Sequence, residues 1–383
     1  MKKIIVAADS FKGSLSASQA CGIIAAQARQ IFPRAQVLEM PVSDGGEGLV
    51  EALISTLEGE LVWVDTQDPL RRPLRASYAM MTDGTALIEM AGAGGFTLLR
   101  PQERDPLQTS SYGVGLLIMD AIKRKADPIY IGLGGSATVD GGIGAAAALG
   151  IRFFNEQDQA LTNGAGLQRI NGLDLHGLRQ LHYPGRLVFL NDVHNPLCGS
   201  NGAAAVFGPQ KGATAQQVKE LDQGLENLAD LVARETGLQL KETVGIGAAG
   251  GFALPFVAFM GAEIHSGIDF VLDLLEFDHK LAGSDLVITG EGRTDAQSVM
   301  GKAISAVATR ARAARVRVAV ISGEIGEGAE GMAALGVDDL VQATPEGQSL
   351  EEALSQAAGN LAIAANKYLH GLKDQYCQDQ PLL

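Results

Sequence analysis

The chain has few of the residues on which many enzyme classes depend. Its 383 residues include only three cysteines and six histidines. Cys21, Cys198 and Cys377 are too far apart for a CxxC pair or a disulfide framework, a pattern typical of proteins in a reducing compartment. The sequence also lacks zinc-ligand spacing and a nucleophile elbow, which argues against metal hydrolases and serine hydrolases.

Long apolar runs and an excess of positive charge are also missing. No stretch approaches the ~18 consecutive apolar residues of a membrane span. The apolar run at 4–8 is shorter than the ~7–15 residues of a signal-peptide core. The net charge of −14, from 44 acidic and 30 basic residues, disfavours nucleic acid and anionic membrane surfaces as partners. We therefore expect a cytoplasmic protein with small-molecule partners, and whether it forms a homodimer stays open.

Glycine, in contrast, is abundant. The 48 glycines make up about 12.5% of the chain, against about 7% in an average protein. No collagen-like period accompanies them, so they are expected in turns and at sites where a ligand approaches the backbone closely. A chain of this length is longer than one hydrophobic core usually spans, which favours two domains.

Strand and helix patterns alternate at both ends of the chain, which predicts parallel sheets. In the centre, apolar segments flank Thr82-Asp83-Gly84, a hairpin signal. The predicted fold class is α/β, with a Rossmann-like parallel-sheet domain (1–66 plus 283–383) and a mixed-sheet α/β domain (67–282) inserted into it. The predicted strands lie at 3–8, 36–40, 75–81, 85–90, 129–133, 187–190, 285–289, 316–322 and 337–341. The predicted helices lie at 16–31, 49–57, 111–125, 143–149, 214–235, 301–314 and 350–369, and the tail after Leu372 is expected to fray.

Two clusters of polar residues and glycines lie near the N-terminus. The loop after the first strand contains Ser10 and Lys12, and an ammonium group with backbone N–H groups there can hold a phosphate or a carboxylate. A plain turn with a solvated lysine is the alternative. In the second cluster, 41–48, Asp44 and Glu47 stand among glycines at a predicted helix start. Helix capping explains Asp44 alone, whereas three glycines also favour close approach of a ligand.

The third cluster, 132–142, follows a predicted strand and precedes a helix of small residues. Gly134, Gly135 and Ser136 can present successive backbone N–H groups, an arrangement that binds anions. Tight helix packing explains the alanines of the following helix but leaves the loop unexplained. We therefore interpret this loop as a phosphate site.

The fourth cluster follows the strand 187–190 and contains Asp192 and Asn195. Asp192 could deprotonate a hydroxyl group or hold a metal, and Asn195 could orient a substrate. Lys211 lies further along, in another glycine-framed turn, and is a candidate for binding phosphate.

The fifth cluster places Glu291, Arg293 and Asp295 directly after a predicted strand, with Lys302 a few residues later. Open α/β sheets bind ligands at the carboxyl ends of their strands, and an arginine can clamp a carboxylate or phosphate through two hydrogen bonds. A structural loop held by salt bridges is the alternative interpretation.

Two nucleotide-binding motifs are disfavoured or absent. Residues 245–250 satisfy G-x-G-x-x-G, and Asp269 lies about 20 residues further on, as a dinucleotide site requires. However, 240–244 is a poor buried strand and Pro255 interrupts the following helix early. A Walker A loop is absent because Ala303 follows Lys302. The remaining loops, cations and carboxylates suit phosphoryl transfer, which depends on positioning and charge neutralisation.

Taken together, these clusters resemble the bacterial type 1 glycerate kinase family, the glycerate 2-kinases. Three departures from common family residues, Val139, Asn191 and Ile304, stand beside the polar positions and leave them intact. The matching segments occur in family order and are DSFKGSLSA (9–17), PVSDGGEG (41–48), GLGGSATVDGG (132–142), DVHNPLCG (192–199), FGPQKGA (207–213), GIGAAGGF (245–252), SGID (266–269) and ITGEGRTDAQSVMGK (288–302).

The resemblance implies ATP-dependent phosphorylation of D-glycerate to 2-phosphoglycerate, in a cleft between two α/β domains. We hypothesise in-line attack of a glycerate hydroxyl on the γ-phosphoryl group of Mg-ATP. Asp192 is predicted to accept the hydroxyl proton, with Asp295 as the second candidate. Lys12 and the Gly134–Ser136 loop are predicted to neutralise phosphoryl oxygens.

The same hypothesis assigns Arg293 to the glycerate carboxylate, and Asp44 and Glu47 to Mg²⁺ or to the substrate. Two other classes of function stay open at this point. An NAD(P)-dependent oxidoreductase would use the glycine pattern at 245–250. A non-catalytic sensor would bind glycerate without turning it over.

Overall fold

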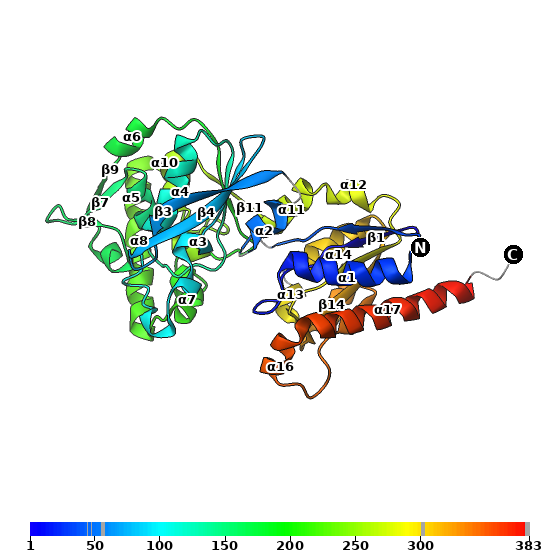
Figure 1. The fold of residues 1–383 in the computed structure, drawn as a ribbon. Coiled ribbons are helices and arrows are strands. Elements are labelled where there is room, and N and C mark those ends of the chain that lie inside the picture. The colour runs from blue at the N-terminus through cyan, green and yellow to red at the C-terminus, as the bar shows by residue number, and fades with distance from the viewer. Residues whose placement is uncertain (44, 47, 55–57, 300–302, 380–383) are drawn as a thin grey trace. The chain divides into compact units, whose positions relative to one another are not determined.

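The computed structural model describes residues 1–43, 45–46, 48–54, 58–299 and 303–379. The chain divides into two compact units (Figure 1). Unit 1 consists of Met1–Asp44, Glu51–Thr56 and Ile268–Leu383, and unit 2 consists of Gly45–Val50 and Leu57–Gly267. Along the chain, unit 1 is interrupted by the segments of unit 2. The boundaries between the two units differ from those expected at 66/67 and 282/283.

Unit 1 contains a five-stranded sheet in which every neighbouring pair is parallel. The central strands are fully buried along Ile4–Val6 and Leu286–Thr289, as expected of a parallel sheet that is covered on both faces. In order across the sheet the strands are β16 (Asp339–Gln342), β14 (Arg317–Ser322), β12 (Leu286–Thr289), β1 (Lys3–Val6) and β2 (Gln36–Glu39).

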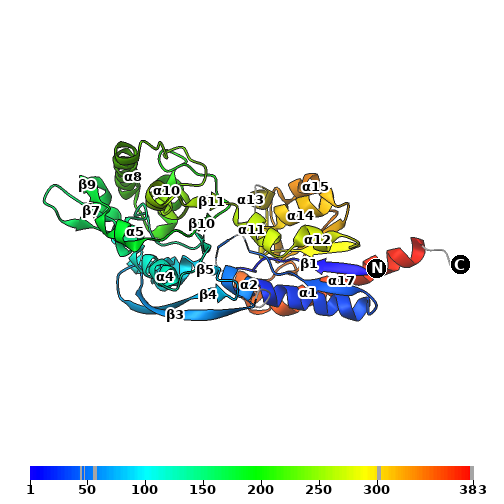
Figure 2. The same ribbon diagram turned by 90° about the horizontal axis from the view of Figure 1, so that it is seen from above.

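Helices cover both faces of this sheet. One core joins the strands to α1 (Ala17–Ile31) and α17 (Ala357–Asp379), while α14 (Ala303–Ala313) lies over the opposite face (Figure 2). A capping box begins α1, because Ser16 Oγ accepts from the N–H of Gln19 at 3.3 Å and the Gln19 side chain accepts from the N–H of Ser16 at 3.0 Å.

Unit 2 contains a six-stranded mixed sheet. Four of its strands are parallel, and β3 and β4 continue the sheet in antiparallel pairing. In order the strands are β11 (Glu263–His265), β10 (Leu187–Leu190), β6 (Ile129–Gly132), β5 (Ala86–Glu89), β4 (Pro73–Met81) and β3 (Gly59–Gln67). A small second sheet contains β7 (Arg152–Phe154), β8 (Ala160–Leu161) and β9 (Gly172–Asp174).

The core of unit 2 lies between this sheet and its helices, among them α4 (Tyr112–Lys123), α5 (Ile143–Ala148), α8 (Ala215–Thr236) and α10 (Leu254–Met260). The shorter helices of the chain are α2 (Leu49–Ile54), α3 (Ala91–Gly94), α6 (His176–Leu181), α7 (Ala203–Phe207), α9 (Ala248–Gly251), α11 (Gly267–Leu274), α12 (Phe277–Leu281), α13 (Ala296–Val299), α15 (Met332–Leu335) and α16 (Leu350–Ser355). The 3₁₀ turns in the described part of the chain are η1 (Phe96–Leu98), η2 (Pro101–Glu103), η3 (Gly164–Arg169), η4 (Pro209–Lys211) and η5 (Ala329–Gly331). A two-stranded sheet pairs β13 (Arg293–Thr294) with β15 (Glu324–Ile325).

The α/β fold class, with one parallel and one mixed sheet, is confirmed. The first domain was expected to run to residue 66; in the structure β3 pairs with β4 over nine residues and belongs to unit 2. Two local expectations were wrong. The helix expected at 350–369 is divided at Gln356 into α16 and α17, and α17 continues to Asp379 where fraying was expected after Leu372. None of the described helices is both long enough and apolar enough to cross a membrane.

Candidate active site

Two loops of unit 1 lie side by side at the carboxyl ends of neighbouring strands. The N–H of Asp9, after β1, donates to the carbonyl of Gly290, after β12, at 2.9 Å. The following turn is closed by Gly13 in the left-handed conformation (φ +83°) and by the hydroxyl of Ser14, which donates to the Phe11 carbonyl at 2.9 Å. Parallel strands therefore bring together two clusters from opposite ends of the sequence.

A pocket of about 610 Å³ opens over these loops. Four predicted site residues line it, namely Ser10, Lys12, Glu291 and Arg293. Much of the remaining wall could not be predicted from the sequence, and it comes from the end of β16 and the segment that follows it. These lining residues include Gln342, Thr344, Gln348, Leu350, Leu354 and Asn360. The sequence feature that could have indicated this part of the pocket wall is the turn Thr344-Pro345-Glu346-Gly347, which follows the last predicted strand.

Glu291 lies at the bottom of the unit 1 pocket with 8% of its surface exposed. Its carboxylate accepts hydrogen bonds from Ser298 Oγ at 2.5 Å and Thr294 Oγ1 at 3.4 Å. Thr294 and Ser322 in turn share a hydroxyl contact of 2.6 Å. These hydroxyl groups solvate a buried carboxylate, which makes a charge at this depth tolerable.

Arg293 lies at the pocket surface and is paired with two carboxylates. Its guanidinium is 3.3 Å from Asp295 Oδ2 and 3.2 Å from Glu324 Oε1, with 56% of the side chain exposed. Asp295 also accepts from the N–H of Gln297 at 2.9 Å. The salt-bridged loop that the sequence offered as an alternative is therefore present, and Arg293 also lines the pocket.

In unit 2, the loop from Gly132 to Gly142 presents backbone donors. Among the described residues, none accepts a hydrogen bond from the N–H of Gly134, Gly135 or Ser136. The loop is anchored through a carbonyl group instead, because Gly135 O accepts a hydrogen bond from the N–H of Phe96 at 3.0 Å. Gly135 adopts φ +70°, which reverses the direction of the chain and suits a residue without a side chain. Successive unused amides of this kind form an anion site.

Lys211 lies beneath this loop, with 3% of its surface exposed. Its ammonium donates to Ser136 Oγ and to the Thr138 carbonyl, both at 2.7 Å. Burial lowers the pKa of Lys211 from its usual 10.5 to about 7, and nearby Asp140 opposes that shift. The predicted phosphate ligand Lys211 therefore contacts the loop itself.

Asp140 is fully buried below the same loop. Its carboxylate accepts from the N–H and hydroxyl of Ser111, at 2.8 and 2.7 Å, and from the N–H of Gly142 at 3.1 Å. Burial raises the pKa of Asp140, and the hydrogen bonds from Ser111 and Gly142 act in the opposite direction. The sequence placed Asp140 in the motif but assigned it no role.

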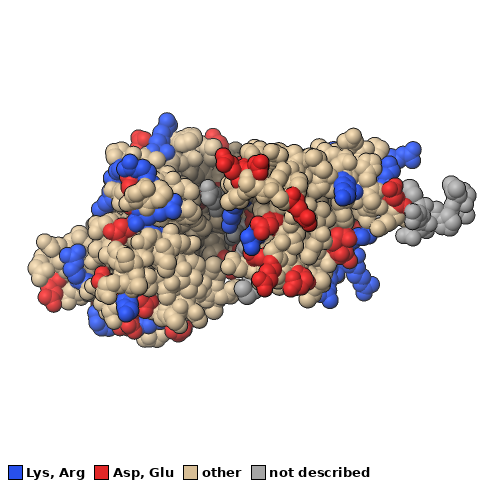
Figure 3. Space-filling model, turned by 90° about the horizontal axis from the view of Figure 1, so that it is seen from below, with Lys and Arg blue, Asp and Glu red and all other residues tan. Residues whose placement is uncertain are grey.

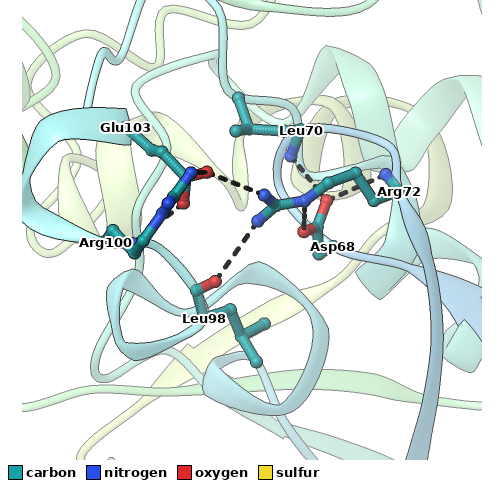
Figure 4. A network of polar contacts seen from close by, with 6 residues as sticks. All are labelled: Asp68, Leu70, Arg72, Leu98, Arg100 and Glu103. Atoms are coloured by element: carbon teal, nitrogen blue, oxygen red, sulfur yellow. Dashed lines mark hydrogen bonds and ion pairs between the residues drawn. The ribbon is translucent and has the colours of Figure 1, made fainter.

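An ion-pair network supports the segment that bonds to this loop (Figure 4). Arg72 contacts Asp68 at 2.5 Å and Glu103 at 2.9 Å, and Glu103 also contacts Arg100 at 2.7 Å. Hydrogen bonds from Arg100 lower the pKa of Glu103 to about 2. The network joins the turn between β3 and β4 to the residues around η1, where Phe96 donates to Gly135.

Asp192 and Asn195 lie in the loop after β10. Asp192 Oδ1 accepts from Ser266 Oγ at 2.7 Å, so the residue is connected to the strand end at β11. Asn195 Nδ2 donates to the carbonyl of Asn201 at 2.8 Å, which shapes the loop. Asn191 has a buried Nδ2 without a described hydrogen-bond partner.

Three predicted site residues, Asp44, Glu47 and Lys302, lie outside the described residues. The described part of the chain contains no group of three or more His, Cys, Asp or Glu side chains that could hold a metal ion. Asp44 and Glu47, the tentative Mg²⁺ ligands, thus stay predictions. On the face drawn in Figure 3, the described acidic and basic side chains are interspersed and form no continuous basic patch.

Known proteins place this arrangement in one family. Residues 4–373 match the model of the glycerate kinase family. A glycerate kinase of Bacillus subtilis (strain 168) is 41% identical, with 97% of this chain and 98% of that protein covered. A glycerate 2-kinase of Escherichia coli (strain K12) is 40% identical, with 95% and 96% covered. The chain belongs to the glycerate kinase family.

A solved structure supports the same assignment for the fold. It is described as glycerate kinase 2 from Salmonella typhimurium LT2 and matches with a TM-score of 0.85 at 39% identity, covering 98% of this chain and 99% of that one. The glycerate kinase resemblance of the sequence motifs and the enzyme class, a kinase, are therefore confirmed.

The G-x-G-x-x-G segment has a structural role in this member of the glycerate kinase family. In the described structure no strand leads into it, since the residues between α8 and α9 form turns, so the context of a dinucleotide site is missing. Gly250 instead adopts φ +74° and accepts from the N–H of Gly141 at 3.0 Å. A side chain at Gly250 would clash with the Thr138 carbonyl, 2.3 Å from an added Cβ. Gly250 thus packs against the loop at 132–142, whereas Gly245 and Gly247 pack against the loop after β10.

Proposed function

We propose that this protein catalyses the ATP-dependent phosphorylation of D-glycerate to 2-phosphoglycerate in the cytoplasm. Family membership supports the reaction class, and the relative named glycerate 2-kinase supports the 2-position. The structural observation that carries the proposal is the run of three unused amides at Gly134–Ser136, because such a run binds phosphoryl oxygens.

The proposed step is an in-line displacement at the γ-phosphorus of ATP. The 2-hydroxyl oxygen of glycerate forms a bond to phosphorus as the bond to the β,γ-bridging oxygen breaks. ADP leaves with the electron pair of that broken bond, and the hydroxyl proton passes to Asp192. The amides of Gly134–Ser136 and the ammonium of Lys12 stabilise the negative charge on the transferred group.

Arg293 is the proposed partner of the glycerate carboxylate. Its guanidinium lines the 610 Å³ pocket and has the planar fork that matches a carboxylate. Asp295, the second candidate for the base, accepts from the N–H of Gln297 and faces Arg293. That bonding suits a residue that orients Arg293, and it favours Asp192 as the proton acceptor.

Mg²⁺ is part of the proposal as the ion that accompanies ATP. Kinases hold Mg²⁺ mainly through the substrate phosphates and one or two carboxylates, so a preformed cluster of three side chains is not required. Asp44 and Glu47 are the proposed carboxylates. The ion would neutralise charge on the phosphates.

A coupled assay for ADP tests the proposal, using ATP, Mg²⁺ and D-glycerate, with L-glycerate as a control for stereospecificity. Phosphorus NMR of the product distinguishes 2-phosphoglycerate from 3-phosphoglycerate. We expect ADP and 2-phosphoglycerate in equal amounts. Absence of ADP with D-glycerate would overturn the kinase proposal. Glycerate binding without turnover would favour the sensor alternative, and NAD(P) reduction would favour the oxidoreductase.

A further inference from the structure

The contact between Lys211 and Ser136 determines where the serine hydroxyl hydrogen can go. A protonated lysine has three hydrogen-bond donors and no acceptor. Ser136 Oγ must therefore be the acceptor in its 2.7 Å contact with Lys211 Nζ. A second donor of the same ammonium is used by the Thr138 carbonyl, also at 2.7 Å. The hydrogen of the Ser136 hydroxyl is left for a different acceptor.

The same serine stands at the end of the run of unused amides. Gly134 and Gly135 are half-buried, and Ser136 keeps 7% of its surface exposed. The described residues offer no acceptor for these three N–H groups. A serine hydroxyl forced to donate, beside three backbone donors, adds a fourth donor suited to an anion.

We propose that Lys211 is a positioning residue that commits the Ser136 hydroxyl to donate a hydrogen bond to the transferred phosphoryl group. This inference rests on the proposed kinase function, and in it Lys211 acts on the phosphoryl group through Ser136. A neutral methionine of similar length cannot donate to Ser136 Oγ, so the serine hydroxyl is no longer committed to donating toward the ligand. The loop would keep its three amides and lose its hydroxyl donor.

The protonation state of Lys211 gives this device a pH dependence. A neutral amine has a lone pair and can accept from Ser136, which would turn the hydroxyl hydrogen away from the ligand. Burial lowers the pKa of Lys211 to about 7, with Asp140 opposing the shift. Another charged residue, Arg104, lies close to the turn that carries Lys211. Its carbonyl group lies against Gly212, and its guanidinium lies over the Phe96 ring, 5.2 Å from the ring centroid.

A double-mutant cycle tests the proposal with Lys211→Met, Ser136→Ala and the combined variant. Each single substitution should lower kcat by about 10- to 100-fold at pH 6.5, as expected for loss of a hydrogen bond to a charged group. Because both remove the same donor, the combined variant should lose at most about twofold more. Lys219→Met, at an exposed position of α8, is the matched control and should behave as wild type. Additive losses, or a wild-type kcat in either single variant, would overturn the proposal.

The pH profile keeps the test informative if Lys211→Met fails to fold. Wild-type kcat should fall above about pH 7, as Lys211 loses its proton. Ser136→Ala should lack that alkaline decrease, since it has no hydroxyl to reorient. The same decrease in both proteins would overturn the role of Lys211 while leaving the kinase proposal intact. A wild-type protein that makes no ADP from ATP and D-glycerate would instead overturn the kinase function, and this inference with it.

Discussion

Asp140 and Ser111 are joined by two hydrogen bonds to one carboxylate oxygen, 2.8 Å from the serine N–H and 2.7 Å from its hydroxyl. Ser111 directly precedes α4, and its Oγ also accepts from the N–H of Ala145 in α5, at 2.9 Å. One serine thus connects the buried carboxylate below the glycine loop to two helices of unit 2.

Replacing this serine should destabilise unit 2. Ser111→Ala removes a hydroxyl donor from fully buried Asp140 and an acceptor from Ala145. A buried group left without its partner costs about 1–3 kcal/mol of unfolding free energy. Urea unfolding followed by circular dichroism measures the loss. Ser200→Ala, at an exposed position, should change the midpoint little, and an equal loss in both variants would contradict the prediction.

The stability of the fold should rise with pH through the titration of Lys211. Its pKa is about 7 in the folded protein, lowered from the 10.5 that is usual for a lysine in an unfolded chain. Between these values the unfolded chain binds more protons than the folded one, so the unfolding free energy increases with pH. Urea midpoints at pH 6.5, 8 and 9.5 should therefore rise more in wild type than in Lys211→Met. If the difference in urea midpoint between the two proteins stays the same at all three pH values, Lys211 keeps its proton over this range and the prediction is wrong.

Substituting Arg293 should weaken glycerate binding in particular. Arg293→Met removes the guanidinium proposed for the substrate carboxylate, and we expect the KM for glycerate to rise by about 10- to 100-fold. Arg293→Lys keeps the charge but loses the planar fork, so its KM for glycerate should lie between those of the wild type and Arg293→Met. Steady-state kinetics with each substrate varied in turn separates glycerate from ATP. Arg34→Met, at an exposed position, is the control. A change in the KM for ATP alone would reassign Arg293 to the nucleotide.

Asp192 and Asp295 should differ in their effect on turnover. If Asp192 accepts the hydroxyl proton, Asp192→Asn should lower kcat by about 10²- to 10⁴-fold. Asp295→Asn, by loosening Arg293 at 3.3 Å, should act mainly on the KM for glycerate. Single-turnover measurements distinguish the chemical step from product release. The reverse pattern, with kcat lost in Asp295→Asn, would exchange the two roles.

Local sequence signals determined most of the secondary structure. Ser16 and Thr214 begin their helices through capping boxes that can be read from residues three positions apart. The β3 strand was missed because exposed Leu61 and Trp63 are apolar like buried Val62 between them, which hides the apolar–polar alternation that predicts a strand. Its stability comes from nine pairings with β4. Pairing of that kind depends on tertiary context.

The glycine-rich loops and the family were determined by the sequence alone, because backbone conformation and motif order are local properties of the chain. Only the tertiary structure decided what lies under and around those loops. It placed Lys211 beneath Ser136, 75 residues away in the sequence, and it closed one pocket around Lys12, Arg293 and the segment after β16. The physical reason is burial: whether an ammonium contacts a ligand or the loop itself depends on packing between distant segments, which no short motif records.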